Sequence, residues 1–277
     1  GEGALGIRAG AENFGNIWRD AMTIEERLKE FKTLGYTIFS GVYSSQDIAS
    51  WKAKYDDMVA RTTPFGASEK KLWLSSAVEL EPKLMLPVVN NAEILDFAER
   101  VMGPFVQLDN LTFMAFPSID RTEAEGRVTG WHRDRWGGMP RGGDYVSPWS
   151  CNAITYLQDL TDEYGPLRLV QGSHRRPITM KAEDLRKPRE DELVLNVKAG
   201  DVVFTHAGLL HTGTPNVSGQ PRYFISTYYT RVGLRTTDNH GGPNVAGGPN
   251  RARERQERRP KRRFGGGPPP PPPAPSG

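Results

Sequence analysis

The stretch Trp131-His132-Arg133-Asp134 decides how this chain is interpreted. Residues two apart on an extended strand point to the same face, so His132 and Asp134 can offer an imidazole and a carboxylate to one ion. Another histidine, His211, follows much later in the stretch Leu210-His211-Thr212-Gly213-Thr214-Pro215-Asn216. If a second strand brings His211 to the same place, the three side chains form a metal site with two nitrogen ligands and one oxygen ligand.

The second feature is Arg222, which begins the apolar run Tyr223-Phe224-Ile225-Ser226-Thr227-Tyr228-Tyr229. An arginine at the start of a buried strand needs an anionic partner, and its guanidinium can hold a carboxylate through two parallel hydrogen bonds. Two histidines and one carboxylate form the facial triad of non-haem iron(II) oxygenases, which leaves other metal positions open. The combination predicts an iron site beside an anchor for an organic acid.

Two turns complete the pattern, at Gly172-Ser173-His174 and at Gly200-Asp201. With these motifs the chain resembles the phytanoyl-CoA dioxygenase family of Fe(II)/2-oxoglutarate-dependent oxygenases, over roughly residues 24–235. One departure is Gln171, at a turn position where a proline is expected. The resemblance implies Fe(II) as the metal, 2-oxoglutarate as cosubstrate on Arg222, O2 as oxidant, and a catalytic and metal-binding set of His132, Asp134 and His211.

The residues leave some alternatives open. His206 ends an apolar run and competes with His211 as the third ligand, although a packed histidine that orients a ligand is the better interpretation. The retained carboxylate of Asp134 favours hydroxylation, while desaturation, cyclisation or epimerisation stay open. The alternative functions are a cupin-like metalloenzyme that does not use 2-oxoglutarate and a non-catalytic jelly-roll binding protein; Arg222 is the feature that separates the first from the favoured function.

Further site residues are expected around this set. Thr155 or Asn152 could also touch the cosubstrate. The irregular segment 117–149 has the length of a functional lid. Arg133 should point away from the metal because strand faces alternate. A small-molecule substrate is expected, anionic if it meets Arg141; the arginines of this segment could equally be solvated at the surface. The candidate substrate contacts are Trp131, Trp136, Arg141 and Trp149.

Helix signals come first and strand signals later, which predicts an α+β fold. Helices are expected at 24–34 with Thr23 as the cap, in the residues that follow a cap at Ser45, and at 92–102 with Asn91 as the cap. Strands are expected at 36–42, 105–116, 149–159, 167–170, 193–197, 202–206 and 222–231. A double-stranded β-helix (jelly roll) backed by the N-terminal helices accommodates this order and leaves an opening for a ligand.

Composition predicts three parts: an N-terminal extension 1–22, an oxygenase domain 23–235, and a disordered Gly/Arg/Pro-rich tail 236–277. The net charge of +3 comes from the tail, because residues 251–263 carry eight Lys/Arg against two Glu. This run is read as a solvated tail, so no nucleic-acid partner is expected. No apolar run has the length of a membrane span, and one cysteine, Cys151, suits a reducing compartment, so the expected location is cytoplasmic.

Overall fold

The structure is a computed structural model that describes residues 22–61, 72–75, 77–134 and 137–234. These residues belong to one unit, Gly1–His240; the other unit, Gly241–Gly277, lies outside the described residues. Nearly all of the predicted N-terminal extension and all of the predicted tail fall outside them as well. The predicted domain boundaries therefore stay predictions.

The N-terminal helices begin and end at the residues that cap them. Helix α2 (Ile24–Leu34) starts at Thr23, whose hydroxyl accepts from the backbone N–H of Glu26 at 3.2 Å, and ends at Gly35 with φ 89°. Helix α3 (Ser45–Ala60) is capped by Ser44, which corrects the prediction that Ser45 is the cap. Helix α6 (Ala92–Met102) begins after Asn91, as predicted.

Three shorter helices were not predicted: α4 (Ala77–Leu80), α5 (Pro82–Val89) and α7 (Arg121–Ala124). Helix α5 carries a proline at its first position and another, Pro87, inside it. Short 3-10 turns also occur at Ser173–Arg175 and Ala182–Asp184. Among the described residues, no helix has the length and apolar composition needed to cross a membrane.

The strands form two antiparallel sheets. The large sheet has six strands in the order β1 (Tyr36–Phe39), β7 (Val202–His206), β4 (Ser150–Tyr156), β9 (Arg222–Arg231), β3 (Val106–Phe116) and β2 (Leu72–Leu74). The small sheet has the order β6 (Leu193–Leu195), β5 (Leu167–Leu169) and β8 (His211–Gly213). Each predicted strand is present, and β2 and β8 are additional.

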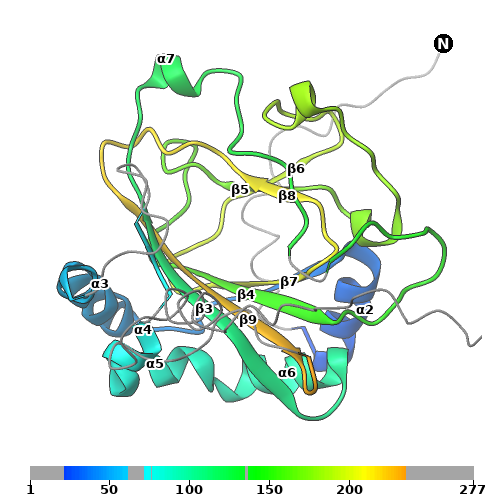
Figure 1. Cartoon of the computed structure of the whole chain (residues 1–277), viewed down its shortest axis with the longest axis horizontal. Helices are drawn as coiled ribbons and strands as arrows, with labels where there is room; N and C mark the ends of the chain where they lie inside the picture. The colour runs from blue at the N-terminus through cyan, green and yellow to red at the C-terminus, as the bar shows by residue number, and fades with distance from the viewer. Residues whose placement is uncertain (1–21, 62–71, 76, 135–136, 235–277) are drawn as a thin grey trace, which may run out of the picture. The chain divides into compact units, whose positions relative to one another are not determined.

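Helices α2 to α6 and the small sheet lie on opposite faces of the large sheet, whereas the short helix α7 lies on the side of the small sheet (Figure 1). Alternate residues of each central strand therefore face different layers. In β7, Phe204 packs on the helix side against Phe31 of α2 and Phe97 of α6, with ring centroids 5.8 and 5.1 Å apart. Its neighbour Val203 is fully buried in the second core, between the two sheets. Ile154, Leu167 and Phe224, which line a cavity, also belong to this second core.

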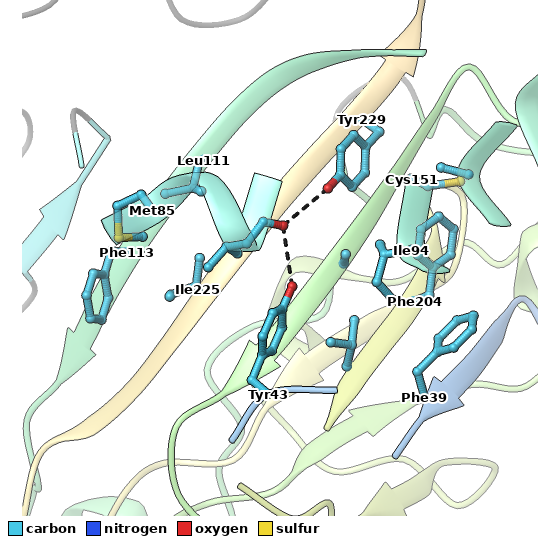
Figure 2. Close-up of a cluster of buried hydrophobic side chains, with 14 of the residues drawn as sticks. Phe39, Tyr43, Met85, Ile94, Leu111, Phe113, Cys151, Phe204, Ile225 and Tyr229 are labelled. Atoms are coloured by element: carbon cyan, nitrogen blue, oxygen red, sulfur yellow. Dashed lines mark hydrogen bonds between the residues drawn. The ribbon is translucent and has the colours of Figure 1, made fainter. Parts of the chain in front are cut away.

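The helix-side core also satisfies a helix end. Two phenols, Tyr43 and Tyr229, point at the carbonyl oxygen of Val88 near the end of α5, at 3.4 and 3.5 Å (Figure 2). Tyr229 also donates to the carbonyl of Val89 at 2.7 Å. The last carbonyls of a helix have no hydrogen-bond partner within the helix. The two hydroxyls supply that partner inside the core, and the one from Tyr229 links α5 to β9.

Candidate active site

The two histidines of the motif meet through the backbone. His132 forms an isolated antiparallel bridge to His211 on β8, in which each N–H donates to the other's carbonyl at 3.0 Å. Two residues further on, the N–H of Asp134 donates to the carbonyl of Ala207 at 2.9 Å. The stretch is therefore pinned at two points and is not the continuous strand that the alternation argument assumed. It nevertheless brings the three predicted ligands together.

The three candidate ligands converge on one point. The Nε2 atoms of His132 and His211 lie 3.9 and 3.8 Å from Oδ1 of Asp134. Two ligands that each lie about 2.1 Å from one ion are separated by at most about 4.2 Å. All the ligand atoms of this group lie within 4.8 Å of one another. A single metal ion therefore fits between them once the ligand atoms move closer together by roughly 1 Å.

Each imidazole has its proton fixed by its own chain. Nδ1 of His132 lies 2.9 Å from the carbonyl of Gly130, and Nδ1 of His211 lies 3.0 Å from the carbonyl of Leu209. A carbonyl only accepts, so each Nδ1 carries the hydrogen and each Nε2 keeps a free lone pair for a metal. The neighbouring His211, followed by partial burial, lowers the pKa of His132 and favours this neutral form.

The carboxylate of Asp134 is held on both oxygens. Tyr228 of β9 donates its hydroxyl to Oδ1 at 3.3 Å, and Asn152 of β4 donates its side-chain amide to Oδ2 at 3.3 Å. Burial, together with the charge of Asp134, raises the pKa of Tyr228 well above its usual value, so the phenol stays protonated and remains a donor. Asn152 lines the cavity, but its described contact is with Asp134.

Arg222 is 4 % exposed and is held by backbone carbonyls. Its Nη1 donates to the carbonyls of Tyr164 at 3.0 Å and of Thr214 at 2.8 Å, and also to the carbonyl of Gly165. Its Nε is buried and has no hydrogen-bond partner among the residues that the structure describes. Within the described part of the chain, Arg222 forms no ion pair with a carboxylate, and burial lowers the pKa of its guanidinium. The protein thus fixes the position of this cation without neutralising it.

A cavity of about 540 Å³ connects the metal-binding group with Arg222. This volume is within the ~300–1,000 Å³ usual for small-molecule sites. His132 and His211 line one part of it and Arg222 another. Between them the walls are largely apolar, with Ile154, Leu167 and Phe224 among the lining residues. An organic acid on Arg222 can therefore extend toward a metal along these apolar walls.

His206, the rival ligand, has both ring nitrogens occupied. The N–H of Gly208 donates to its Nδ1 at 2.9 Å, and its Nε2 lies 3.2 Å from the carbonyl of Val146. The ring packs against His174, with centroids 4.9 Å apart. Burial is the largest of the effects that lower the pKa of each of these two histidines to about 4. His206 is thus a packed neutral side chain that belongs to another part of the core.

Arg133 points away from the metal-binding group, in the direction that alternation predicts. Its Nη1 donates to the carbonyl of Ser173 at 2.9 Å and to that of Gly208, and its Nη2 donates to the carbonyl of Arg176 at 3.2 Å. The side chain therefore ties the 131–134 stretch to two neighbouring turns.

The structure places three of the predicted substrate contacts, Trp131, Trp149 and Arg141, away from the cavity lining. Trp131 is buried in a small apolar cluster, and its indole N–H donates to the carbonyl of Lys187 at 2.9 Å. Trp149 and Arg141 are exposed, and neither they nor Trp131 line the cavity. Trp136 lies outside the described residues.

Thr155 also needs correction as a cosubstrate contact. It is buried and does not line the cavity, whereas its neighbours Ile154 and Tyr156 do, because successive strand residues point to opposite faces.

Several polar wall residues were not predicted from the sequence, among them Tyr228, Asp109 and Asn110. Tyr228 could have been found from the alternation of β9, because it lies an even number of residues from Arg222. Asp109 carried no such signal, because it faces the cavity through an irregularity of β3 that the sequence pattern does not reveal.

Comparison with known proteins bears on this site. Residues 31–224 match the phytanoyl-CoA dioxygenase (PhyH) family. The chain belongs to this family. Its predicted enzyme class, a 2-oxoglutarate-dependent non-haem iron dioxygenase, is confirmed with that membership, as is the predicted pair of iron and 2-oxoglutarate. An ectoine dioxygenase of Bordetella parapertussis is 21% identical over 251 residues, covering 77% of each chain.

Two solved structures show the same fold at low identity. HygX from Streptomyces hygroscopicus, with nickel, 2-oxoglutarate and hygromycin B bound, is 16% identical, with a TM-score of 0.61, covering 78% of this chain and 90% of HygX. The epimerase SnoN from nogalamycin biosynthesis, described as non-haem and α-ketoglutarate-dependent, is 22% identical with a TM-score of 0.58, covering 75% of this chain and 80% of SnoN.

Proposed function

We propose that this dioxygenase oxidises a C–H bond of a small molecule, with release of succinate and CO2 from 2-oxoglutarate. Bound iron and 2-oxoglutarate would together supply the oxidising chemistry, with O2 as the oxidant. The two packed antiparallel sheets form, on this proposal, the double-stranded β-helix whose open end admits the substrate. HygX, which binds hygromycin B in its structure, and SnoN, which has also been solved in complex with nogalamycin RO, support a small-molecule substrate.

His132, Asp134 and His211 would hold the iron. The donor set of two neutral imidazoles and one carboxylate suits Fe(II) and leaves other coordination positions to ligands. The chain orients these donors before a metal arrives, since two carbonyls fix the imidazole protons and Tyr228 and Asn152 hold Asp134. Mutation of residues that hydrogen-bond to metal ligands in this way typically lowers metal affinity or activity by about 10- to 100-fold.

The observation that carries the proposal is Arg222, a buried guanidinium that faces the same cavity as the metal-binding group and has no carboxylate partner among the described residues. A buried cation without an anion is costly, so an anionic ligand belongs there. The far carboxylate of 2-oxoglutarate is that ligand on our proposal. The carbonyls on Nη1 hold the guanidinium in place and leave its remaining donors for the ligand.

Titration of 2-oxoglutarate into Fe(II)-loaded protein without oxygen tests this assignment. Arg222→Ala should weaken binding by roughly a hundredfold or more, because removing one partner of a buried charge pair costs ~3–5 kcal/mol. Arg222→Lys keeps the charge without the planar fork, so its loss should be smaller. Arg231→Lys is the matched control, because Arg231 ends the same strand, donates to the carbonyl of Pro148 at 3.1 Å and does not line the cavity.

The results of the iron and 2-oxoglutarate titrations separate the proposed function from its alternatives. Equal 2-oxoglutarate affinity in wild type and Arg222→Ala would refute the role of Arg222. Iron binding without any 2-oxoglutarate binding would favour the cupin-like metalloenzyme, and failure to bind iron would favour the non-catalytic binding protein. Succinate release with a panel of small molecules then identifies substrates, and product analysis separates hydroxylation from desaturation, cyclisation and epimerisation.

A further inference from the structure

Tyr156 lies at the Arg222 end of the cavity. It is the last residue of β4 and pairs with Phe224 of β9, and both side chains line the cavity. Arg222 is two residues from Phe224 along β9, so it is the diagonal neighbour of Tyr156. Diagonal neighbours on one face of an antiparallel pair lie about 7–8 Å apart, within reach of aromatic and long side chains. The phenol and the guanidinium therefore face the same part of the cavity.

Aromatic packing holds both groups in this position. The ring of Phe224 packs against those of Tyr156 and Phe116, with centroids 5.7 and 5.4 Å away. The guanidinium of Arg222 lies over the ring of Phe116, 5.3 Å from its centroid. If Tyr156 turned away from the cavity, it would lose its contact with Phe224. This end of the cavity thus combines one cation with packed rings.

The hydroxyl of Tyr156 has no hydrogen-bond partner among the residues that the structure describes. The residue is only 5 % exposed, and the hydroxyl of a buried tyrosine usually finds a partner. Tyr229, on the helix side of the sheet, does so at the carbonyl of Val89. Burial, partly offset by the charge of Arg222, raises the pKa of Tyr156 to about 12. The phenol therefore stays protonated and offers the cavity a hydrogen-bond donor.

The guanidinium of Arg222 keeps a donor open beside this phenol. Its bonds to backbone carbonyls all come from Nη1, and Nη2 has no acceptor within the described part of the chain. Gly213 lines the cavity here, and a Cβ at that position would lie 3.4 Å from Nη2, so the glycine leaves room for a ligand. A carboxylate has about four acceptor positions, so one that binds Nη2 can also accept from a phenol.

We propose that the Tyr156 hydroxyl donates a hydrogen bond to the far carboxylate of 2-oxoglutarate and positions this cosubstrate together with Arg222. The inference rests on the proposed function, because it adds a residue to the same cosubstrate site. The sequence motifs that identify the family do not include Tyr156. The two donors come from different strands, β4 and β9, so they hold the carboxylate from two sides, whereas Arg222 alone holds it from one.

Two acids of equal chain length test the contact. 2-Oxovalerate has the five-carbon chain of 2-oxoglutarate with a methyl group in place of the far carboxylate. Each acid is titrated without oxygen into the Fe(II)-loaded protein. Tyr156→Phe should weaken 2-oxoglutarate binding roughly 10- to 100-fold, as expected for the loss of a hydrogen bond to a charged group, and leave 2-oxovalerate binding unchanged.

Tyr36→Phe is the matched control. Tyr36 belongs to the same core as Tyr156, but it does not line the cavity, and its hydroxyl accepts from the side-chain amide of Gln171 at 3.1 Å. The Tyr36→Phe variant should bind both acids as the wild type does and should melt at a lower temperature, because it loses that hydrogen bond. Ligand-free Tyr156→Phe should melt no lower than the wild type, because the hydroxyl that it loses has no partner in the described protein.

Three results would overturn the inference. The first is equal 2-oxoglutarate affinity in wild type and Tyr156→Phe. The second is an equal loss of affinity for both acids. The third is a lower melting temperature of ligand-free Tyr156→Phe, or its failure to fold, which would show that the hydroxyl supports the fold. If 2-oxovalerate binds too weakly to titrate, the first and third results decide. In each case 2-oxoglutarate binding by the wild type would leave the proposed function intact, whereas its absence would contradict that function instead.

Discussion

Gly165 lies against the guanidinium of Arg222 and the carbonyls that hold it. Its φ is +80°, and a Cβ there would lie 2.4 Å from the carbonyl oxygen of Thr214, 2.5 Å from that of Pro215 and 2.6 Å from Nη1 of Arg222. The carbonyls of Gly165 and Thr214 are themselves acceptors for that Nη1. Gly165→Ala therefore disturbs the support of the guanidinium without changing any side chain that binds a ligand.

The size of the effect follows from these distances. A carbon and a backbone oxygen normally approach to about 3.3 Å, so the loop must move by roughly 1 Å. A displacement of about 1 Å at a positioning group can cost on the order of a hundredfold in function. We expect Gly165→Ala to weaken 2-oxoglutarate binding by roughly 10- to 100-fold. The left-handed backbone adds a stability loss of about 1–2 kcal/mol.

Gly219 provides a matched control. Its φ is +79°, but no atom of the described residues lies within 4 Å of the Cβ position. Gly219→Ala should therefore show a similar loss of stability without a change in 2-oxoglutarate affinity. The assays are thermal unfolding and anaerobic titration of 2-oxoglutarate into the Fe(II)-loaded variants. Equal affinities in Gly165→Ala and Gly219→Ala would refute the reasoning, because strain alone would then account for the effect of both substitutions.

Three further predictions concern the histidines and the tail. His211→Ala should abolish stoichiometric iron binding, whereas His206→Gln should retain it, because both nitrogens of His206 already have partners; metal analysis after anaerobic loading would contradict the ligand assignment if the outcomes were reversed. His174 and His206 have pKa values lowered to about 4, so they are neutral when folded and take up protons on unfolding below about 6.5. The stability that depends on their neutral form is complete above pH 6.5 and is lost as the pH falls toward 4. The free energy of unfolding should therefore drop by roughly 2 kcal/mol per histidine between pH 7 and 5. An equally steep drop in His206→Gln would argue against these histidines as its cause. Removal of 236–277 should leave the melting temperature and iron binding unchanged, as calorimetry and metal analysis of the shortened chain would establish.

The parts of the site that could be predicted are those with a local signal. His132, Asp134, His211 and Arg222 stand in short motifs, and the capping residues Thr23 and Asn91 mark helix starts directly. Motifs of this kind depend on nearby residues, so a single sequence is sufficient to recognise them.

What could not be predicted depends on register and packing. Asn152 and Thr155 are both polar residues of one strand, and only its pairing decides that Asn152 faces the cavity while Thr155 faces away. Trp131 and Trp149 have the composition of a binding surface, yet one is core and the other exposed. The bulge at Asp109 is a tertiary feature, because it is defined only against β9.

The layering of the large sheet has a consequence for how this enzyme can change. In β4, Cys151 and Ala153 pack with the helices, while Asn152 and Ile154 face the cavity. Neighbouring positions are therefore constrained differently, one by core packing and the next by the contents of the cavity. Substitutions on the cavity face alter what the pocket accepts and leave the helix-side packing largely untouched. A library that randomises cavity-facing positions of β3, such as Thr112 and Met114, should therefore yield mostly folded proteins. Such separation allows new specificities to accumulate in the laboratory, or over evolutionary time, without a matching loss of the scaffold.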